Sequence, residues 1–267
     1  MKKTRVYQIT AAIAAAAILT GSIATYNIYE SSASTQAAVV SETEDSTLSL
    51  EDVDVISFLG DSITYGLGSD VRFSDVVAEL AGIETSNNYG ISGTLVSTGS
   101  TYKIENAFIN RYSEIDEDSD IIFIMGGTND WARCVTLGSL GDTTTDTYYG
   151  ALEALITALQ EEYPDAEIVL ATPIKRVDAV NYDGYTQDED GNMVNPNGDS
   201  LEDFANAVLE VAEAYGITVL DLYHAEETDF TSDTSYTTYW SDGLHPNSNG
   251  QTIMAEYIYE QLAEIYA

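Results

Sequence analysis

The sequence predicts a doubly wound α/β fold, in which about five parallel strands are covered by helices on both faces. Short runs of β-branched and other apolar residues alternate with segments whose apolar residues recur at helical spacing. The strand-like runs are apolar almost throughout, which is typical of parallel strands buried on both faces. Hydrophobic residues make up 44% of the chain, enough for a sizeable core.

Five segments are expected to form the sheet: Val53–Leu59, a weaker strand over Glu84–Tyr89, Ile121–Met125, Ala166–Ala171 and Ile217–Leu222. Four helices are expected between and after them: Phe73–Leu80, Tyr148–Tyr163, Leu201–Tyr215 and Gln251–Tyr266. Pro164 and Gly216 stand where the second and third of these helices should end. Ligand sites in such sheets form at the carboxyl ends of the strands, so the segments after each strand are the ones to search.

The first 24 residues have the pattern of a secretory signal peptide. Lys2, Lys3 and Arg5 precede an apolar run over residues 9–24, which is shorter than the roughly 20 residues of a spanning helix. We expect residues 1–24 to be removed and the protein to be secreted or extracellular; an uncleaved N-terminal membrane anchor is the alternative. Residues 25–50 are rich in Ser, Thr, Ala and Glu and are expected to form a disordered spacer. Residues 51–267 then form a single domain, which we expect to be monomeric.

The charge balance excludes several partners. The chain has 45 acidic and 9 basic residues, a formal net charge of −36. Binding to nucleic acid or to an anionic lipid surface needs clustered basic residues, so neither is expected. The acidic excess favours a neutral substrate over an anionic one. The single cysteine, Cys134, allows no intrachain disulfide and no cysteine cluster for a metal.

Polar motifs follow three of the expected strands. After the first strand, Ser62 stands in a Gly-Asp-Ser turn, where a hydroxyl can become a nucleophile if a base takes its proton. After the second, Gly90 and Gly93 allow backbone N–H groups to approach a ligand closely. After the third, the amide of Asn129 can offer an N–H to a developing oxyanion.

A fourth motif, Asp242-Gly243-Leu244-His245-Pro246, lies near the C-terminus. Gly243 permits a turn that brings Asp242 against the ring of His245, where a carboxylate fixes the tautomer of the imidazole. Asp221-Leu222-Tyr223-His224 has the same Asp-x-x-His spacing. However, Asp221 falls within an expected strand, where residues three apart point to opposite faces. We therefore expect His245 rather than His224 to act as the base.

In this order, these four motifs resemble the SGNH (GDSL-type) hydrolase superfamily of serine esterases, and the resemblance covers about Val53 to Ala267. It implies a flavodoxin-like sheet. It also implies that Ser62 is the nucleophile, that His245 is the general base and then the general acid, and that Asp242 orients His245. The N–H groups of Ser62 and Gly93 and the side chain of Asn129 would form the oxyanion hole. The implied reaction is ester hydrolysis through an acyl-enzyme, without a metal or an organic cofactor.

Each assignment has a structural alternative. Ser62 can be a helix N-cap, and Gly93 and Asn129 can be turn residues. Asp61 and Asp130 are expected to hold their loops through hydrogen bonds to the backbone rather than to take part in chemistry.

The loops suggest the kind of ester. Residues 176–200 are polar and too long for a plain connection, and we expect them to overhang the site from the end of the fourth strand. No long apolar lid is evident. These features suit a carbohydrate ester such as the O-acetyl groups of polysaccharides. A lipid or thioester acylhydrolase on the same scaffold and a non-catalytic surface binding module remain the alternatives.

Overall fold

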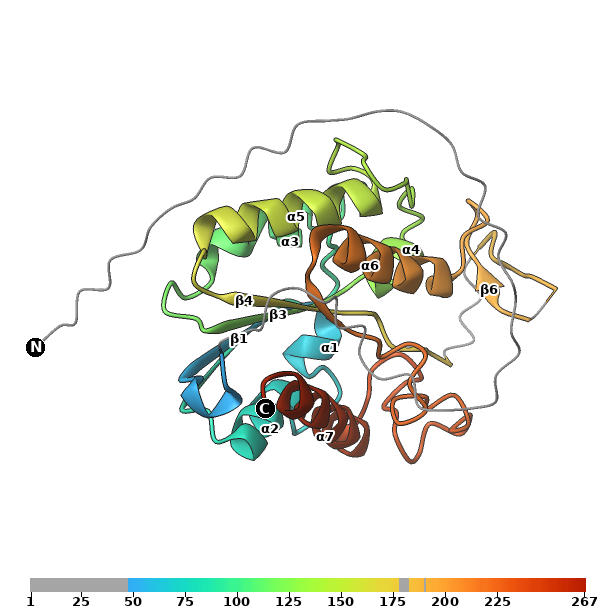
Figure 1. Ribbon diagram of the computed structural model, residues 1–267. Helices are drawn as coiled ribbons and strands as arrows, with labels where there is room; N and C mark the ends of the chain where they lie inside the picture. The colour runs from blue at the N-terminus through green and yellow to red at the C-terminus, as the bar shows by residue number, and fades with distance from the viewer. Residues whose placement is uncertain (1–47, 178–182, 190) are drawn as a thin grey trace, which may run out of the picture. The chain divides into compact units, whose positions relative to one another are not determined.

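The computed structural model describes residues 48–177, 183–189 and 191–267 (Figure 1). The expected signal peptide and nearly all of the expected spacer lie outside the described residues. Within the described part of the chain, no helix is both long and apolar enough to cross a membrane.

A five-stranded parallel sheet forms the centre of the domain, as the sequence predicted. Its strands are β1 (Val55–Gly60), β2 (Thr85–Gly90), β3 (Ile121–Met125), β4 (Glu167–Ala171) and β7 (Thr218–Leu220). They are ordered β2-β1-β3-β4-β7, and each neighbouring pair runs parallel. When the five strands are numbered by their sequence order, this is the flavodoxin-like order 2-1-3-4-5.

Helices cover both faces of the sheet (Figure 1). One face carries α3 (Phe108–Arg111), α5 (Tyr148–Glu162) and α6 (Leu201–Tyr215), and the other carries α2 (Phe73–Ala81) and α7 (Ser248–Ile265). Because successive strand residues point to opposite faces, β3 contributes to two cores. Ile122 and Ile124 pack with the first group of helices, whereas Ile121 and Phe123 pack with the second.

Local capping sets the ends of the long helices. Ser200 and Asp203 form a capping box at the start of α6, and Gly216 ends this helix with a left-handed φ of 64°. Helix α7 begins three residues before the predicted Gln251, because the side chain of Asn247 accepts hydrogen bonds from the N–H groups of Asn249 and Gly250.

The structure adds short elements that are too brief to show a sequence period. These are α1 (Ser62–Tyr65), α4 (Thr128–Ala132), the 3₁₀ turns η1 (Leu50–Asp52), η2 (Ile104–Asn106) and η3 (Tyr112–Glu114), and the two-residue strands β5 (Thr186–Gln187) and β6 (Met193–Val194). The N–H of Leu50 donates to the carbonyl of Tyr266 at 2.9 Å. The folded part thus begins slightly before the expected boundary at residue 51.

Candidate active site

The candidate site lies where the chain changes sides of the sheet. Strands β1 and β3 are neighbours, yet the helices that follow β1 cover one face and those that follow β3 cover the other. In an open parallel sheet, such a divergence is the usual place for a ligand, in a crevice outside the carboxyl ends of the strands. Ser62 follows β1 and Asn129 follows β3, so both come to this crevice.

Ser62 is the first residue of α1 and is largely buried. Asp61 caps this short helix, accepting a hydrogen bond from the N–H of Ile63 at 2.9 Å. Gly90, at the end of β2, lies against α1 so closely that a Cβ there would stand 2.3 Å from the backbone nitrogen of Tyr65. A glycine is therefore required where β2 passes beneath the helix of Ser62.

Ser62, His245 and Asp242 form a continuous chain of side-chain contacts. His245 Nε2 lies 3.0 Å from Ser62 Oγ, and His245 Nδ1 lies 2.7 Å from Asp242 Oδ2. The other carboxylate oxygen of Asp242 accepts the N–H groups of Leu244 and His245, in a turn that Gly243 closes with a φ of 85°. Partial burial alone would raise the pKa of Asp242. Hydrogen bonds from the His245 ring and from these two N–H groups outweigh it and hold the pKa below its usual value.

Within the described residues, the backbone N–H groups of Ser62 and Gly93 donate no hydrogen bond. Gly93 has a left-handed φ of 76°. Open donors of this kind beside a serine hydroxyl are what an oxyanion would bind. Asn129 differs from the sequence expectation, since its Nδ2 already donates to Asp61 Oδ2 at 3.1 Å and to the Thr94 carbonyl at 3.0 Å. Contact with an oxyanion would require this amide to share or release one of these bonds.

Asp61 and Asp130 make the loop-holding contacts that the sequence suggested. Asp130 is fully buried and accepts hydrogen bonds from the N–H groups of Val96 and Ser97 and from the Ser97 hydroxyl. It thereby ties the loop after β2 to the loop after β3. Burial raises the pKa of both carboxyl groups to about 6, against the opposing effect of their hydrogen bonds.

Sequence reasoning missed a buried cation beneath the site. Arg111 is 3% exposed and donates to three carbonyls, those of Gly60, Tyr89 and Asn106, at 2.6–2.9 Å. It joins the carboxyl ends of β1 and β2 directly below the Gly-Asp-Ser turn. Burial lowers the pKa of its guanidinium to about 10, which leaves it charged at neutral pH. A single arginine within an otherwise ordinary helical segment gives no sequence signal for this role.

Gln251 is a second missed support. It is fully buried in the first turns of α7, where its amide donates to the Ile63 carbonyl and accepts the Phe73 N–H, at 2.9 and 2.8 Å. The C-terminal helix is thus attached to the helix that carries Ser62.

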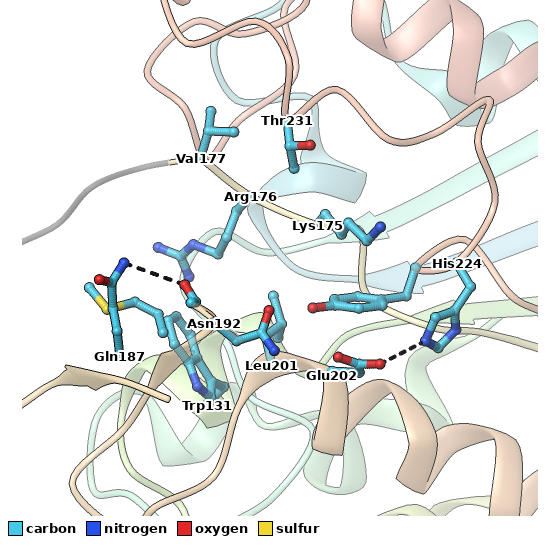
Figure 2. Close-up of a pocket in the computed structure, with 13 residues that line it drawn as sticks. Trp131, Lys175, Arg176, Val177, Gln187, Asn192, Leu201, Glu202, His224 and Thr231 are labelled. Atoms are coloured by element: carbon cyan, nitrogen blue, oxygen red, sulfur yellow. Dashed lines mark hydrogen bonds and ion pairs between the residues drawn. The ribbon is translucent and has the colours of Figure 1, made fainter. Parts of the chain in front are cut away.

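A polar pocket of about 550 Å³ borders the site (Figure 2). Arg176, on its wall, donates to the hydroxyl of Thr128 at 3.0 Å, and Val177 N–H donates to the Gly243 carbonyl at 2.9 Å. The pocket therefore adjoins both the Asn129 loop and the His245 turn. Residues of the β5–β6 hairpin line its far side. The described parts of the 176–200 segment accordingly lie beside the site, as expected, while residues 178–182 and 190 lie outside the described residues.

The expectation for His224 was wrong in its geometry. Strand β7 ends at Leu220, so Asp221 is free to turn back, and its Oδ2 lies 2.8 Å from His224 Nδ1. The pair therefore forms in spite of the spacing argument. The ring nitrogen on the other side, His224 Nε2, lies 3.4 Å from a carboxylate oxygen of Glu202 (Figure 2). Among the described residues, no serine hydroxyl is within hydrogen-bond distance of this nitrogen, whereas Ser62 Oγ lies 3.0 Å from His245 Nε2.

No group of three or more His, Cys, Asp or Glu side chains within the described ranges is placed to hold a metal ion.

Comparisons with known proteins show the family and the fold of the chain. The model of the GDSL-like lipase/acylhydrolase family matches residues 58–253. A solved structure of a Lactobacillus plantarum protein is 31% identical with a TM-score of 0.67, and the match covers 79% of this chain and 97% of that one. A possible lipase from Chitinophaga pinensis is 22% identical with a TM-score of 0.61, over 80% of this chain and 99% of that one.

A variant of an acetyl-xylooligosaccharide esterase from Geobacillus is 20% identical with a TM-score of 0.53, over 78% of this chain and 94% of that one. At this identity the likeness concerns the fold alone. No curated protein is significantly similar in sequence.

Proposed function

Because the chain belongs to the GDSL-like lipase/acylhydrolase family, we propose that it is a serine esterase whose nucleophile is Ser62. The observation that carries the proposal is the unbroken chain of contacts from Ser62 Oγ through both ring nitrogens of His245 to Asp242. With its Nδ1 proton directed at Asp242, His245 presents the lone pair of Nε2 to the serine hydroxyl. This is the arrangement a general base needs.

The reaction follows from these positions. His245 takes the proton of Ser62 as Oγ attacks the ester carbonyl, and the negative charge that develops on the carbonyl oxygen is bound by the Ser62 and Gly93 N–H groups, with Asn129 beside them. His245 then returns the proton to the departing alcohol, which leaves an acyl group on Ser62. A water molecule, deprotonated by His245, attacks this acyl group, and release of the carboxylic acid restores the serine. Asp242 orients the ring and stabilises its cationic form.

The surroundings of Ser62 favour a small acyl group on a polar alcohol. The adjoining pocket is lined by charged and amide side chains, among them Lys175, Asn192 and Glu202. Such a wall suits the hydroxyls of a sugar better than an alkyl chain. We therefore propose carbohydrate esters, with O-acetyl groups of polysaccharides as the substrate class. The long-chain lipid or thioester acylhydrolase is the alternative that the same scaffold would allow.

For its location, we propose that the protein is secreted as a monomer. The basic and then apolar pattern of residues 1–24 supports this proposal. Residue-level mass spectrometry of the N-terminus of protein recovered from the culture medium would test it. If the protein is recovered only from membranes and still carries residues 1–24, the uncleaved membrane anchor is favoured.

A kinetic experiment tests the proposed function. The purified protein should hydrolyse 4-nitrophenyl acetate, and Ser62→Ala should lower kcat by at least about 10³-fold. Ser232→Ala, a change at an exposed serine, is the matched control and should leave kcat unchanged. A series of 4-nitrophenyl esters of increasing acyl length should show the highest kcat/KM for acetate. Undiminished activity in Ser62→Ala would refute the nucleophile, and an optimum at long chains would favour the lipid or thioester alternative.

A further inference from the structure

The basic residues of the folded domain are all gathered at one end of the molecule. Outside the first 47 residues the chain has six of them: Arg72, Lys103, Arg111, Arg133, Lys175 and Arg176. Arg111 and Arg176 contact the loops that follow β1 and β3, and Lys175 follows β4. Arg72 lies over the ring of Tyr65 in α1. Lys103 donates to the carbonyl of Ser92, next to Gly93.

Several acidic residues lie at the opposite end, although others, among them Asp61, Asp130 and Asp242, lie at the site itself. Asp54, Glu84 and Asp120 directly precede β1, β2 and β3, and Glu167 is the first residue of β4. The cations of the described residues therefore lie at the carboxyl ends of the strands, around Ser62, whereas acidic residues lie at both ends. In a protein with 45 acidic residues, this placement of the few cations makes the field around Ser62 less negative than the net charge implies.

Within this set, Lys103 and Arg133 lie where they can reach a bound substrate. A Cβ placed on Gly93 would stand 3.3 Å from the ring of Tyr102 and 3.6 Å from Lys103 Nζ. The guanidinium of Arg133 stacks on the same Tyr102 ring, 3.7 Å from its centre. We call Tyr102, Lys103 and Arg133 the basic rim. It borders the backbone N–H of Gly93, one of the two donors assigned to the oxyanion.

The cations of the basic rim are not neutralised. Among the described residues, neither Lys103 nor Arg133 has a carboxylate within ion-pair distance. The acid nearest in sequence, Glu105, is exposed and accepts a hydrogen bond from Asn106 instead. Lys103 also has a left-handed φ of 51°, a conformation that costs free energy for a residue with a side chain. Such strain is commonly retained at functional positions.

We propose that the basic rim binds a carboxylate on the alcohol portion of the substrate, so that the preferred ester is an acetylated acidic sugar such as a uronate. This deepens the proposed function and rests on it. The net charge of the chain had favoured a neutral substrate, but composition does not report where the few cations lie. A carboxylate beside the scissile ester would accept hydrogen bonds from Arg133 and Lys103 while the acetyl carbonyl lies at Gly93.

Matched substrates test the proposal in the full-length protein. O-acetylated methyl galacturonoside and its 6-carboxamide differ only in the carboxylate, and acetate release is measured for both. We expect about a tenfold preference in kcat/KM for the acid at low salt, since each exposed cation contributes roughly threefold. The preference should shrink at 1 M salt, where the Debye length is about 3 Å. Arg133→Gln and Lys103→Gln should each reduce the preference to roughly threefold.

Gln160→Glu is the matched control. It makes the same change in net charge at an exposed position near the C-terminal end of α5, away from the site, and should preserve the preference. Equal kcat/KM for the two sugars would overturn the inference. An equal loss of preference in Gln160→Glu would also overturn it. So would a protein that prefers 4-nitrophenyl hemisuccinate to the neutral 4-nitrophenyl butyrate but does not prefer the uronoside to its carboxamide.

Binding separates this inference from the proposed function. Calorimetry on Ser62→Ala should show about tenfold tighter binding of the acetylated uronoside than of its carboxamide, and Arg133→Gln in that background should reduce the difference to roughly threefold. If 4-nitrophenyl acetate is not hydrolysed at all, the proposed function fails, while discrimination in binding still supports the basic rim. Equal binding of the two sugars overturns the proposal for the basic rim, whether or not 4-nitrophenyl acetate is hydrolysed.

Discussion

At the scale of single residues, the two histidines have similar pairings with aspartate but different partners at the second ring nitrogen. Each pairs through Nδ1 with an aspartate three residues earlier, at 2.7 Å for His245 and 2.8 Å for His224. They differ at Nε2, which meets Ser62 Oγ in one case and a Glu202 carboxylate in the other. The Asp-x-x-His spacing alone could not distinguish them. Whether the aspartate can contact the histidine three residues later depends on where the preceding strand ends.

We therefore expect His245→Ala to lower kcat on 4-nitrophenyl acetate by at least about 10³-fold, because no other described group can take the Ser62 proton. His224→Ala should change kcat only slightly. Steady-state kinetics of the two variants, with circular dichroism to verify folding, makes the comparison. The reverse ranking would transfer the role of base to His224.

Asp61 gives a prediction about pH. Burial raises its pKa from 3.8 to about 6, so the folded state binds this proton more tightly than the unfolded state. The contribution of Asp61 to stability is then most favourable below pH 4 and is lost as the pH rises through 6. Asp61→Asn removes the titration and keeps an oxygen that can cap Ile63.

Relative to Asp61→Asn, the wild type should lose about 3 kcal/mol of unfolding free energy between about pH 4 and pH 7, with no further loss above pH 7. Urea unfolding of both proteins at four pH values measures this difference, in which titrating groups that do not interact with Asp61 cancel. If the unfolding free energies of the two proteins change in parallel between pH 4 and pH 7, the pKa of Asp61 is not raised.

At the scale of elements, the sequence was informative where a period or a cap exists. The run Ile121–Met125 and the helix Leu201–Tyr215 are found with the predicted bounds, since one is a fully buried strand and the other has a capping box and a terminal glycine. The site motifs could be located because they follow strands. The short helices α1 and α4, which carry Ser62 and Asn129, have four and five residues and leave no pattern.

What the sequence could not supply is the support beneath these motifs. Arg111 donates to three carbonyls from separate segments. Gln251 forms hydrogen bonds with two residues that precede it by about 180 positions. Such contacts are decided by tertiary packing and not by local preference. The two hydrogen bonds donated by the Asn129 amide could not be predicted from the sequence for the same reason.

Arg111→Met tests this support. It removes the donors of three buried hydrogen bonds and leaves their carbonyls unsatisfied, which should cost about 2–4 kcal/mol of unfolding free energy. The Gly60 carbonyl belongs to the Gly-Asp-Ser turn, so losing its partner should misplace Ser62. We therefore expect kcat to fall by a larger factor than KM rises. Arg72→Met is the matched control, as Arg72 is exposed, and should cost little in either measurement. Equal effects of the two changes on urea unfolding and kinetics would contradict the proposed support of the site by Arg111.

At the scale of the whole molecule, the fold class followed from the sequence because alternation of strands and helices allows few topologies. The distribution of charge did not follow from it. Six cations that are dispersed between positions 72 and 176 come to one end of the domain. Five lie in or beside loops of that end, and Arg111 reaches it from the end of α3, where its guanidinium contacts the Gly60 and Tyr89 carbonyls. Composition gives the sum of the charges, whereas the topology decides the field at the site.

The N-terminal boundary of the domain is also a property of the whole fold. Leu50 and Val53 are 9% and 4% exposed and pack in the same core as residues of α7, at the other end of the chain. The Leu50 N–H also donates to Tyr266. These contacts join the two ends of the domain, so residues 48–53 should be needed for full stability even though they precede the first strand.

A chain that begins at Leu48 should therefore unfold at the same urea concentration as one that begins at residue 25. A chain that begins at Asp54 should lose about 3–5 kcal/mol, from the burial of two apolar side chains. The loss acts on stability and not on the site, since no contact of these residues reaches Ser62. Below its unfolding midpoint, the shorter chain should keep the kcat of the longer one. Equal midpoints for the chains beginning at Leu48 and Asp54 would show that the fold begins at β1 and that the turn before it contributes nothing.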